Sequence, residues 1–158
     1  MRQEELDIRL VELRENKQLT QMHRWEFMRY SGTAVDVELS TNFRKDGPKR
    51  LVVLELGAHY STMRGQIRRR LLDYVVDAEF EINDIDGVID ADREELVLTT
   101  DLLRLMLSIA IGAIRGMIAL RTSGTFLVHY PLPVYNLDEM VDNIVAAGAE
   151  VAYNPMAY

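Results

Sequence analysis

The chain has no cysteine, only three histidines and one tryptophan among its 158 residues. Without cysteine it can form no disulfide framework, no thiol nucleophile and no cysteine-ligated zinc site. His23, His59 and His129 lie far apart, and no two have the short spacing of a metal site on one element. We therefore expect no bound metal, and neither a disulfide-stabilised nor a thiol-dependent class of protein.

Basic residues and catalytic motifs are scarce as well. Lysine and arginine number 18 against 25 aspartates and glutamates, so the formal net charge is -7, which disfavours nucleic acid as a partner. The sequence has no glycine-rich phosphate loop and no nucleophile-elbow motif around Ser31, Ser61 or Ser123. The aspartates of residues 84–90 lack the glycine position and the closing glutamate of a calcium loop. The pattern predicts a protein that is not an enzyme and has no cofactor.

No targeting or membrane segment is expected. Residues 1–5 are polar and acidic where a signal peptide would begin its apolar core, which favours a cytoplasmic protein. The run Leu102–Leu120 approaches the ~20 apolar residues of a bilayer span. Arg104 and Arg115 interrupt it, and each would cost roughly 2.5–3.5 kcal/mol at the bilayer centre. We expect no membrane insertion, and a single domain over residues 1–158.

Residues 6–82 show the alternation of apolar and polar side chains that is typical of half-buried strands. The alternation predicts strands at 6–11, 35–40, 51–56 with an extension to 60, and 72–82. After a break, the first strand has a possible continuation through Leu19, Met22, Trp25 and Phe27. A hairpin is signalled by Lys45-Asp46-Gly47-Pro48. The arginine-rich segment 61–70 predicts either a basic hairpin tip or the start of a short helix. Its arginines form either a solvated turn or a basic patch that contacts an acidic partner.

The strand at 72–82 has one apolar face and one acidic face. The acidic face carries Asp73, Asp77, Glu79 and Glu81. The plainest interpretation is that these carboxylates form a solvated face of the sheet.

A long helix follows the sheet. Thr99 or Thr100 is expected to cap it, with Asp101 in the first turn, where a negative charge meets the positive end of the helix dipole. Two apolar stripes run along it, Leu102, Met106, Ile109, Ala113 and Met117 on one side and Leu103, Leu107, Ile111, Ile114 and Ile118 on the other. One stripe can cover the sheet, which leaves the other for a second subunit.

Two glycines in the long helix point to the same contact. Gly112 and Gly116 each cost roughly 1 kcal/mol in a helix interior, which suggests that another backbone approaches there. We therefore predict a homodimer or homotetramer with Gly112, Gly116 and Met117 at the interface between subunits.

The chain after the helix is expected to turn, extend and close with a short helix. Gly124 supplies a left-handed residue at the helix end. Residues 126–134 alternate as an extended segment in which Pro131 and Pro133 exclude helix. Asn136 then caps a helix that Gly148 ends. The expected fold is therefore α+β: a four-stranded antiparallel sheet over about residues 5–82, then a long helix, an extended loop and a short C-terminal helix over about 99–148.

The residues of this second half carry a family resemblance. Arg-Thr-Ser-Gly-Thr-Phe at 121–126, Leu-Pro-Val at 132–134 and Asn-Leu-Asp at 136–138 follow the order found in the C-terminal half of the SecB protein-export chaperones. The chain thus resembles a distant SecB-like protein, and the order of its elements agrees with that fold. It differs by the inserted Tyr135, by Leu137 in place of an aromatic residue, and by residues 111–115 in place of the family's Pro-Tyr-Ala-Arg run.

The resemblance implies an ATP-independent holdase that binds unfolded polypeptides and is linked to protein export. A groove for such clients would be lined by Trp25, Phe27, Tyr130, Leu132, Val134, Tyr135, Leu137 and Met140, although these side chains also suit a plain core. Asp77 and Glu79 occupy the strand with which SecB proteins dock the export ATPase SecA. The cysteine- and histidine-containing zinc tail of many SecB proteins has no counterpart here. Two alternatives stay open: a chaperone dedicated to one client, such as an antitoxin, and an oligomeric adaptor without chaperone activity.

Overall fold

The computed structural model describes residues 8–19, 34–46, 48–83, 89–90, 95–96 and 98–147. Its main sheet has four antiparallel strands in the order β1-β4-β3-β2. They are β1 (Ile8–Leu19), β2 (Asp36–Asp46), β3 (Leu51–Arg64) and β4 (Ile67–Ile82). A small ribbon pairs β5 (Ile89–Asp90) with β6 (Glu95–Leu96). Helix α2 (Thr100–Arg121), the 3-10 helix η2 (Phe126–His129) and helix α3 (Leu137–Ala146) follow.

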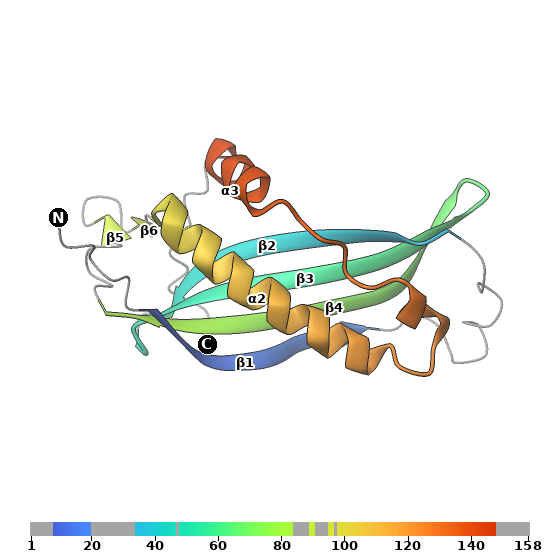
Figure 1. The fold of residues 1–158 in the computed structure, drawn as a ribbon, viewed down its shortest axis with the longest axis horizontal. Helices are drawn as coiled ribbons and strands as arrows, with labels where there is room; N and C mark the ends of the chain where they lie inside the picture. The colour runs from blue at the N-terminus through green and yellow to red at the C-terminus, as the bar shows by residue number, and fades with distance from the viewer. Residues whose placement is uncertain are drawn as a thin grey trace.

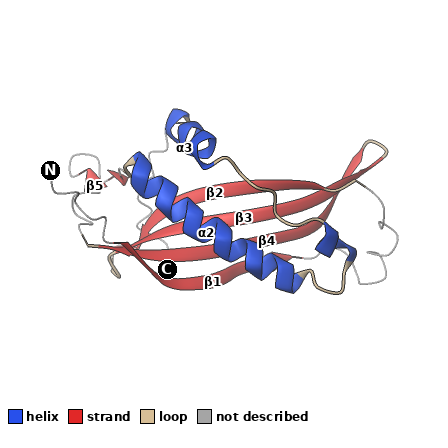
Figure 2. Cartoon of the chain, in the orientation of Figure 1, coloured by secondary structure: helices blue, strands red, loops and turns tan. Residues whose placement is uncertain are grey.

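The helices and the sheet form two layers. Helix α2 crosses the strands diagonally, and α3 lies beside the N-terminal part of α2 (Figure 1). Helix α2 lies over one face of the sheet (Figure 2). The predicted α+β class, with a four-stranded antiparallel sheet, a long helix and a short C-terminal helix, is confirmed.

The core lies between α2 and the two central strands, β3 and β4. Because side chains alternate across a strand, every second residue of β3 and β4 points at the helix, and these side chains are buried: Leu54, Leu56, Tyr60, Tyr74, Val76 and Phe80. The helix buries all five residues of its Leu103–Ile118 stripe, together with Leu102 and Met106. On the other stripe Ile109, Ala113 and Met117 are only partly buried. One stripe therefore covers the sheet, as predicted.

Strand β1 is longer than the alternation predicts, and its bulges explain why. Leu10 pairs with Phe80, but Leu13 rather than Glu12 pairs with Ala78, so the register shifts between Leu10 and Glu12. A bulge inserts one residue and reverses the phase of the side chains. The apolar period of two therefore breaks at residue 11, although the strand continues to Leu19. The expected continuation through Met22, Trp25 and Phe27 lies outside the described residues.

Two tight hairpins join β2, β3 and β4. Asp46 accepts a hydrogen bond from the Lys49 backbone N–H (3.3 Å), which stabilises the predicted turn at 45–48. At the other end, Gly65 has a φ of 63°, which favours glycine, and β3 turns directly into β4. Of the two structures left open for residues 61–70, the hairpin tip is confirmed and the short helix is wrong. Contact with an acidic partner stays a prediction.

The segment after α2 corrects one expectation. Thr99, one of the two predicted caps, caps the helix, and its Oγ1 accepts from the Leu102 N–H at 3.3 Å. The extended segment, however, begins only at residue 131, because Phe126–His129 forms η2. Thr125 caps η2 by accepting from the Leu127 N–H, and the turn buries Leu127. Alternation in a short segment does not distinguish a strand from a 3-10 turn that has a single buried residue.

Candidate functional site

The most distinctive surface is formed by residues 130–136, which we call the strap, together with α3. The strap leaves η2 and runs back beside α2 to the start of α3 (Figure 1). Three buried side chains anchor this region to the core: Leu127 before the strap, Leu132 within it and Val141 in α3. The strap is therefore held at intervals, and Val134 faces solvent between these anchors.

Helix α2 also holds the strap by hydrogen bonds to its backbone. Arg115 Nη2 donates to the Pro133 carbonyl at 2.8 Å, and Nε donates to the Leu132 carbonyl at 3.4 Å. Pro131 and Pro133 have no backbone N–H and a fixed φ. The strap is thus an extended segment of reduced conformational freedom, so ordering it costs little entropy.

The start of α3 is tied down by polar contacts. Asn136 Oδ1 accepts from the backbone N–H groups of Asp138 and Glu139, which are otherwise unsatisfied at a helix start. Arg104 bridges to α3 by donating from Nε to Asp138 at 2.8 Å, while its Nη1 contacts Asp101 on its own helix. The hydrogen bond and the charge of Asp138 hold the pKa of Arg104 above its usual range.

The outward side of the strap is apolar. Val134 is 93% exposed, and Val128 in η2 and Val145 in α3 are about half exposed. The remaining side chains here pack on the core with one side and meet solvent with the other: Tyr130, Tyr135, Leu137 and Met140. Three carboxylates of α3, those of Asp138, Glu139 and Asp142, are exposed beside them. The result is an apolar strip with an acidic rim.

Beneath the strap lie two buried phenol groups. Among the described residues, the hydroxyls of Tyr60 in β3 and Tyr135 in the strap have no hydrogen-bond partner. Burial, with a smaller contribution from Tyr135, raises the pKa of Tyr60 to about 12. Burial also raises the pKa of Tyr135, against the opposing charge of Arg115. A buried hydroxyl without a partner costs about 1–3 kcal/mol of folding stability. The two phenols therefore destabilise the packing of the strap on the core.

The structure places most of the predicted client-binding residues in this region, and their role stays a prediction. Of its eight proposed client-binding residues, Tyr130, Val134, Tyr135, Leu137 and Met140 lie on the strip, and Leu132 is a buried anchor. Trp25 and Phe27 lie outside the described residues. Sequence reasoning missed Tyr60 and Arg115. Arg115 is one of the few polar residues on an apolar helix, and that isolation was the available signal.

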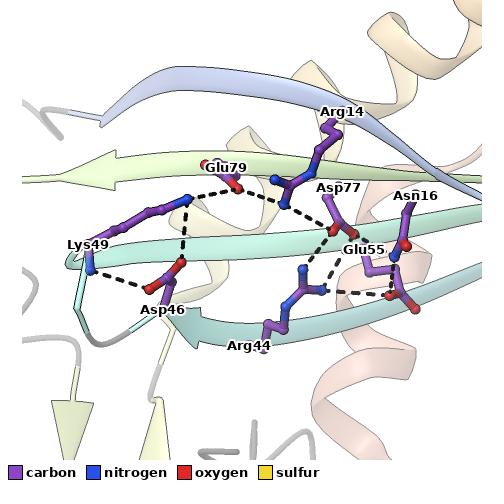
Figure 3. A network of polar contacts seen from close by, with 8 residues as sticks. All are labelled: Arg14, Asn16, Arg44, Asp46, Lys49, Glu55, Asp77 and Glu79. Atoms are coloured by element: carbon purple, nitrogen blue, oxygen red, sulfur yellow. Dashed lines mark hydrogen bonds and ion pairs between the residues drawn. The ribbon is translucent and has the colours of Figure 1, made fainter. Parts of the chain in front are cut away.

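The opposite face of the sheet corrects the expectation of solvated carboxylates. Asp73, Asp77 and Glu79 are all buried. Figure 3 shows the central part of this face, where cations from β1, β2 and the hairpin at 45–50 lie over the acids of β3 and β4. Basic side chains from neighbouring strands thus take the place of water around the carboxylates.

Distances within this network show where it is strongest. Arg44 Nη2 contacts Asp77 Oδ2 at 2.6 Å, and Arg14 Nη2 contacts Glu79 Oε1 at 3.1 Å. The hydrogen bond to Asp77 raises the pKa of Arg44 against the effect of burial. A partner that bound Asp77 or Glu79 directly would have to displace these arginines. The assignment of the two acids to a SecA contact stays a prediction.

The residues predicted at a subunit interface are found on the outer side of α2. Gly112 and Gly116 are exposed, and a Cβ added at either would meet no atom of the described chain within 4 Å. Met117 is partly buried against the core. Leu120, at 76% exposed, extends the same helix surface. The geometry leaves room for a second backbone at these glycines.

Two further findings concern metals and membranes. No group of three or more histidine, aspartate or glutamate side chains within the described ranges is arranged to hold a metal ion. Helix α2 is long and apolar enough to cross a membrane by length and composition alone. The same helix buries one whole stripe of its side chains in the core, as a helix that covers a sheet does.

Comparison with known proteins gives the following. No protein-family model and no curated protein matches the chain. Among solved structures, it is similar to a SecB-like chaperone of Mycobacterium tuberculosis in complex with a peptide from an antitoxin, with 16% identity, a TM-score of 0.41, and coverage of 82% of this chain and 89% of that one. It is also similar to a protein of unknown function from Streptococcus agalactiae, with 9% identity, a TM-score of 0.38, and coverage of 84% and 98%.

Proposed function

We propose that the chain is an ATP-independent, SecB-like holdase that binds apolar stretches of non-native polypeptides along the strap and α3. The observation that carries this proposal is the near-complete exposure of Val134 on a segment whose backbone is held in place. A lone exposed valine needs no explanation. Here the exposed valine lies next to the partly exposed Tyr135 on a pre-ordered strap, and the partly exposed Leu137 follows at the start of α3. Together they form a surface suited to an apolar ligand.

The chemistry of the strip defines the client. Its side chains are aliphatic and aromatic with few hydrogen-bonding groups, so it suits segments that bury apolar side chains without a fixed sequence. In the acidic rim, Asp138 is paired with Arg104, and the exposed Glu139 and Asp142 favour clients that carry lysine or arginine beside their apolar residues. Such segments are buried in folded proteins and exposed in unfolded ones. Binding them lowers the concentration of aggregating chains by mass action, without nucleotide.

We also propose that the chaperone is a symmetric oligomer formed through the outer side of α2. Gly112 and Gly116 leave that side open to a second backbone, and a two-fold contact uses the same patch on both copies. Repeating the strip in two or more copies would let one long client bind several sites at once, which raises avidity without new contacts.

The direct test is suppression of aggregation. The purified chain is mixed with a thermally unfolding model enzyme, without ATP, and light scattering is followed. The proposal predicts stoichiometric suppression that weakens when the client's lysines are acetylated. No suppression at molar excess would contradict it. Light scattering of the chain alone gives its oligomeric state, and a pull-down from lysate distinguishes broad from single-client binding.

A further inference from the structure

Three side chains form a hydrogen-bonded chain across the sheet face that no described helix covers. Ser40 Oγ lies 2.8 Å from His59 Nε2, and His59 Nδ1 lies 2.6 Å from Asp73 Oδ1. The three come from β2, β3 and β4. A hydroxyl, an imidazole and a carboxylate linked in this order are the groups by which serine hydrolases activate a nucleophile.

The strand register produces this alignment. His59 lies directly opposite Asp73 across β3 and β4, and Ser40 lies opposite Gly57, two residues from His59 on β3. Gly57 is required for the contact. A Cβ at this position would lie 2.5 Å from Ser40 Oγ and 2.8 Å from His59 Nε2, so any side chain there would push the two groups apart.

The charges around His59 set the direction of the hydrogen bonds. Burial raises the pKa of Asp73, but the hydrogen bonds from His59 and Arg70 outweigh it, so the pKa lies below its ordinary value and the carboxyl is ionised. An ionised carboxylate only accepts, so His59 Nδ1 carries the proton. In the neutral imidazole Nε2 is then an acceptor for the Ser40 hydroxyl. Glu38, opposite His59 on β2, is itself paired with Arg68 at 3.0 Å.

We propose that Ser40 is an activated nucleophile that small activated esters acylate, with His59 as general base and Asp73 as the residue that positions His59. Ser40 is exposed and open to such a reagent. Its Oγ forms a bond to the acyl carbon, the bond to the leaving aryloxide breaks, and the hydroxyl proton passes to His59 Nε2 and then to the aryloxide. Water then hydrolyses the acyl-serine and releases the acid, by the same proton route in reverse.

The surroundings limit the substrates. The site lies on an open sheet, where water screens the developing oxyanion. Esters with good leaving groups react with little further stabilisation of this oxyanion, whereas amides need much more. We therefore assign activated esters, and exclude peptides, as substrates. This activity does not depend on the holdase proposal.

The test uses 4-nitrophenyl acetate with the full chain. Release of nitrophenolate is followed at early times, and the acetyl group is located by peptide mapping. The expected adduct is on Ser40, and not on Ser108 or Ser123, which are exposed serines on α2 and its following turn. Ser40→Ala should abolish the adduct. His59→Gln should slow acetylation by about 100-fold, at the low end of general-base effects. Gly57→Ala, which keeps all three groups but separates them, should slow it by about 100-fold as well.

Each contrary result overturns the proposal. Acetylation of Ser40 no faster than that of Ser108 and Ser123 would show that the serine is not activated. Rapid nitrophenolate release that survives Ser40→Ala would show that a group other than Ser40 is the nucleophile. An unchanged rate in His59→Gln would exclude it as base. Circular dichroism and the aggregation assay, measured on every variant, keep a folding defect distinguishable from a lost reaction.

Discussion

Arg115 in the middle of α2 donates a hydrogen bond to the carbonyl of Pro133 at 2.8 Å. The strap has no strand partner among the described residues, and its two prolines have no N–H to donate. An arginine with several donors therefore provides what a neighbouring strand otherwise would. The strap is held in place by the same helix that forms the core.

Replacing Arg115 by methionine should loosen the strap without unfolding the protein. Methionine keeps an aliphatic side chain but loses both donors, so we expect lower NMR order parameters for the backbone amides of Leu132, Val134 and Tyr135. Global stability should fall by about 1 kcal/mol, as for a partly exposed hydrogen bond. Arg104→Met, whose side chain contacts Asp101 and Asp138 instead, is the control and should leave these order parameters unchanged. Equal order parameters in wild type and Arg115→Met would contradict this role.

Removing the hydroxyl group should change the free energy of unfolding in opposite directions at Tyr60 and Tyr74. Tyr60→Phe removes a hydroxyl without a partner among the described residues and should raise the free energy of unfolding by about 1 kcal/mol. Tyr74 donates to Glu15, so Tyr74→Phe should lower it by about 1–2 kcal/mol. Urea unfolding measures both. Equal destabilisation by the two substitutions would mean that the Tyr60 hydroxyl is hydrogen-bonded in solution.

The ion pairs on the sheet face should differ in strength with burial. Asp77 is almost fully buried, so Arg44→Met leaves a carboxylate with weaker partners, and we expect a loss of about 2–3 kcal/mol, less than for a fully buried pair. Arg9→Met breaks the exposed pair with Glu81 and should cost under about 1 kcal/mol. Urea unfolding of both variants tests the order. A smaller loss of stability for Arg44→Met than for Arg9→Met would contradict the claim that the buried pair is the stronger one.

Glu15 makes part of the stability depend on pH. Hydrogen bonds from Tyr74 and Arg121 lower its pKa below the ordinary value of 4.5. A carboxyl with a lower pKa in the folded chain contributes stability above its ordinary value and loses that contribution as pH falls through the folded value. Glu15→Gln should therefore be less stable than wild type at neutral pH, with the difference shrinking below pH 4.5. A difference that stays constant with pH would exclude this linkage.

The sheet and long helix were predictable because each has a periodic signal. Alternation locates β2, β3 and β4, and the Leu103–Ile118 stripe identifies the face of α2 that meets them. Signals that depend on one residue were also reliable, as with the caps at Thr99 and Asn136. Strand β1 was cut short because a bulge changes the phase of the pattern without changing the residue types.

The sites were less predictable because they depend on register. Asp77 and Glu79 are buried because arginines of β1 and β2 lie over them. The sequence of β4 alone does not show which residues of those two strands come next to its carboxylates. Ser40, His59 and Asp73 likewise lie on three different strands and become neighbours only through the pairing. The resemblance to SecB proteins predicted client binding by residues of the strip, which stays a prediction. The role of Arg115 depends on how the strap lies beside α2, which no local pattern indicates.

The most direct test of the holdase account is substitution of the most exposed residue of the strip. Val134 is 93% exposed, so Val134→Asp should leave the melting temperature unchanged while placing a charge where a client's apolar side chains would dock. Ile67→Asp, at an exposed β-branched residue on the β3–β4 hairpin, is the matched control. Aggregation suppression per folded molecule is measured for both variants and for wild type. The account predicts a several-fold loss in Val134→Asp and none in Ile67→Asp; equal activity in all three proteins would contradict it.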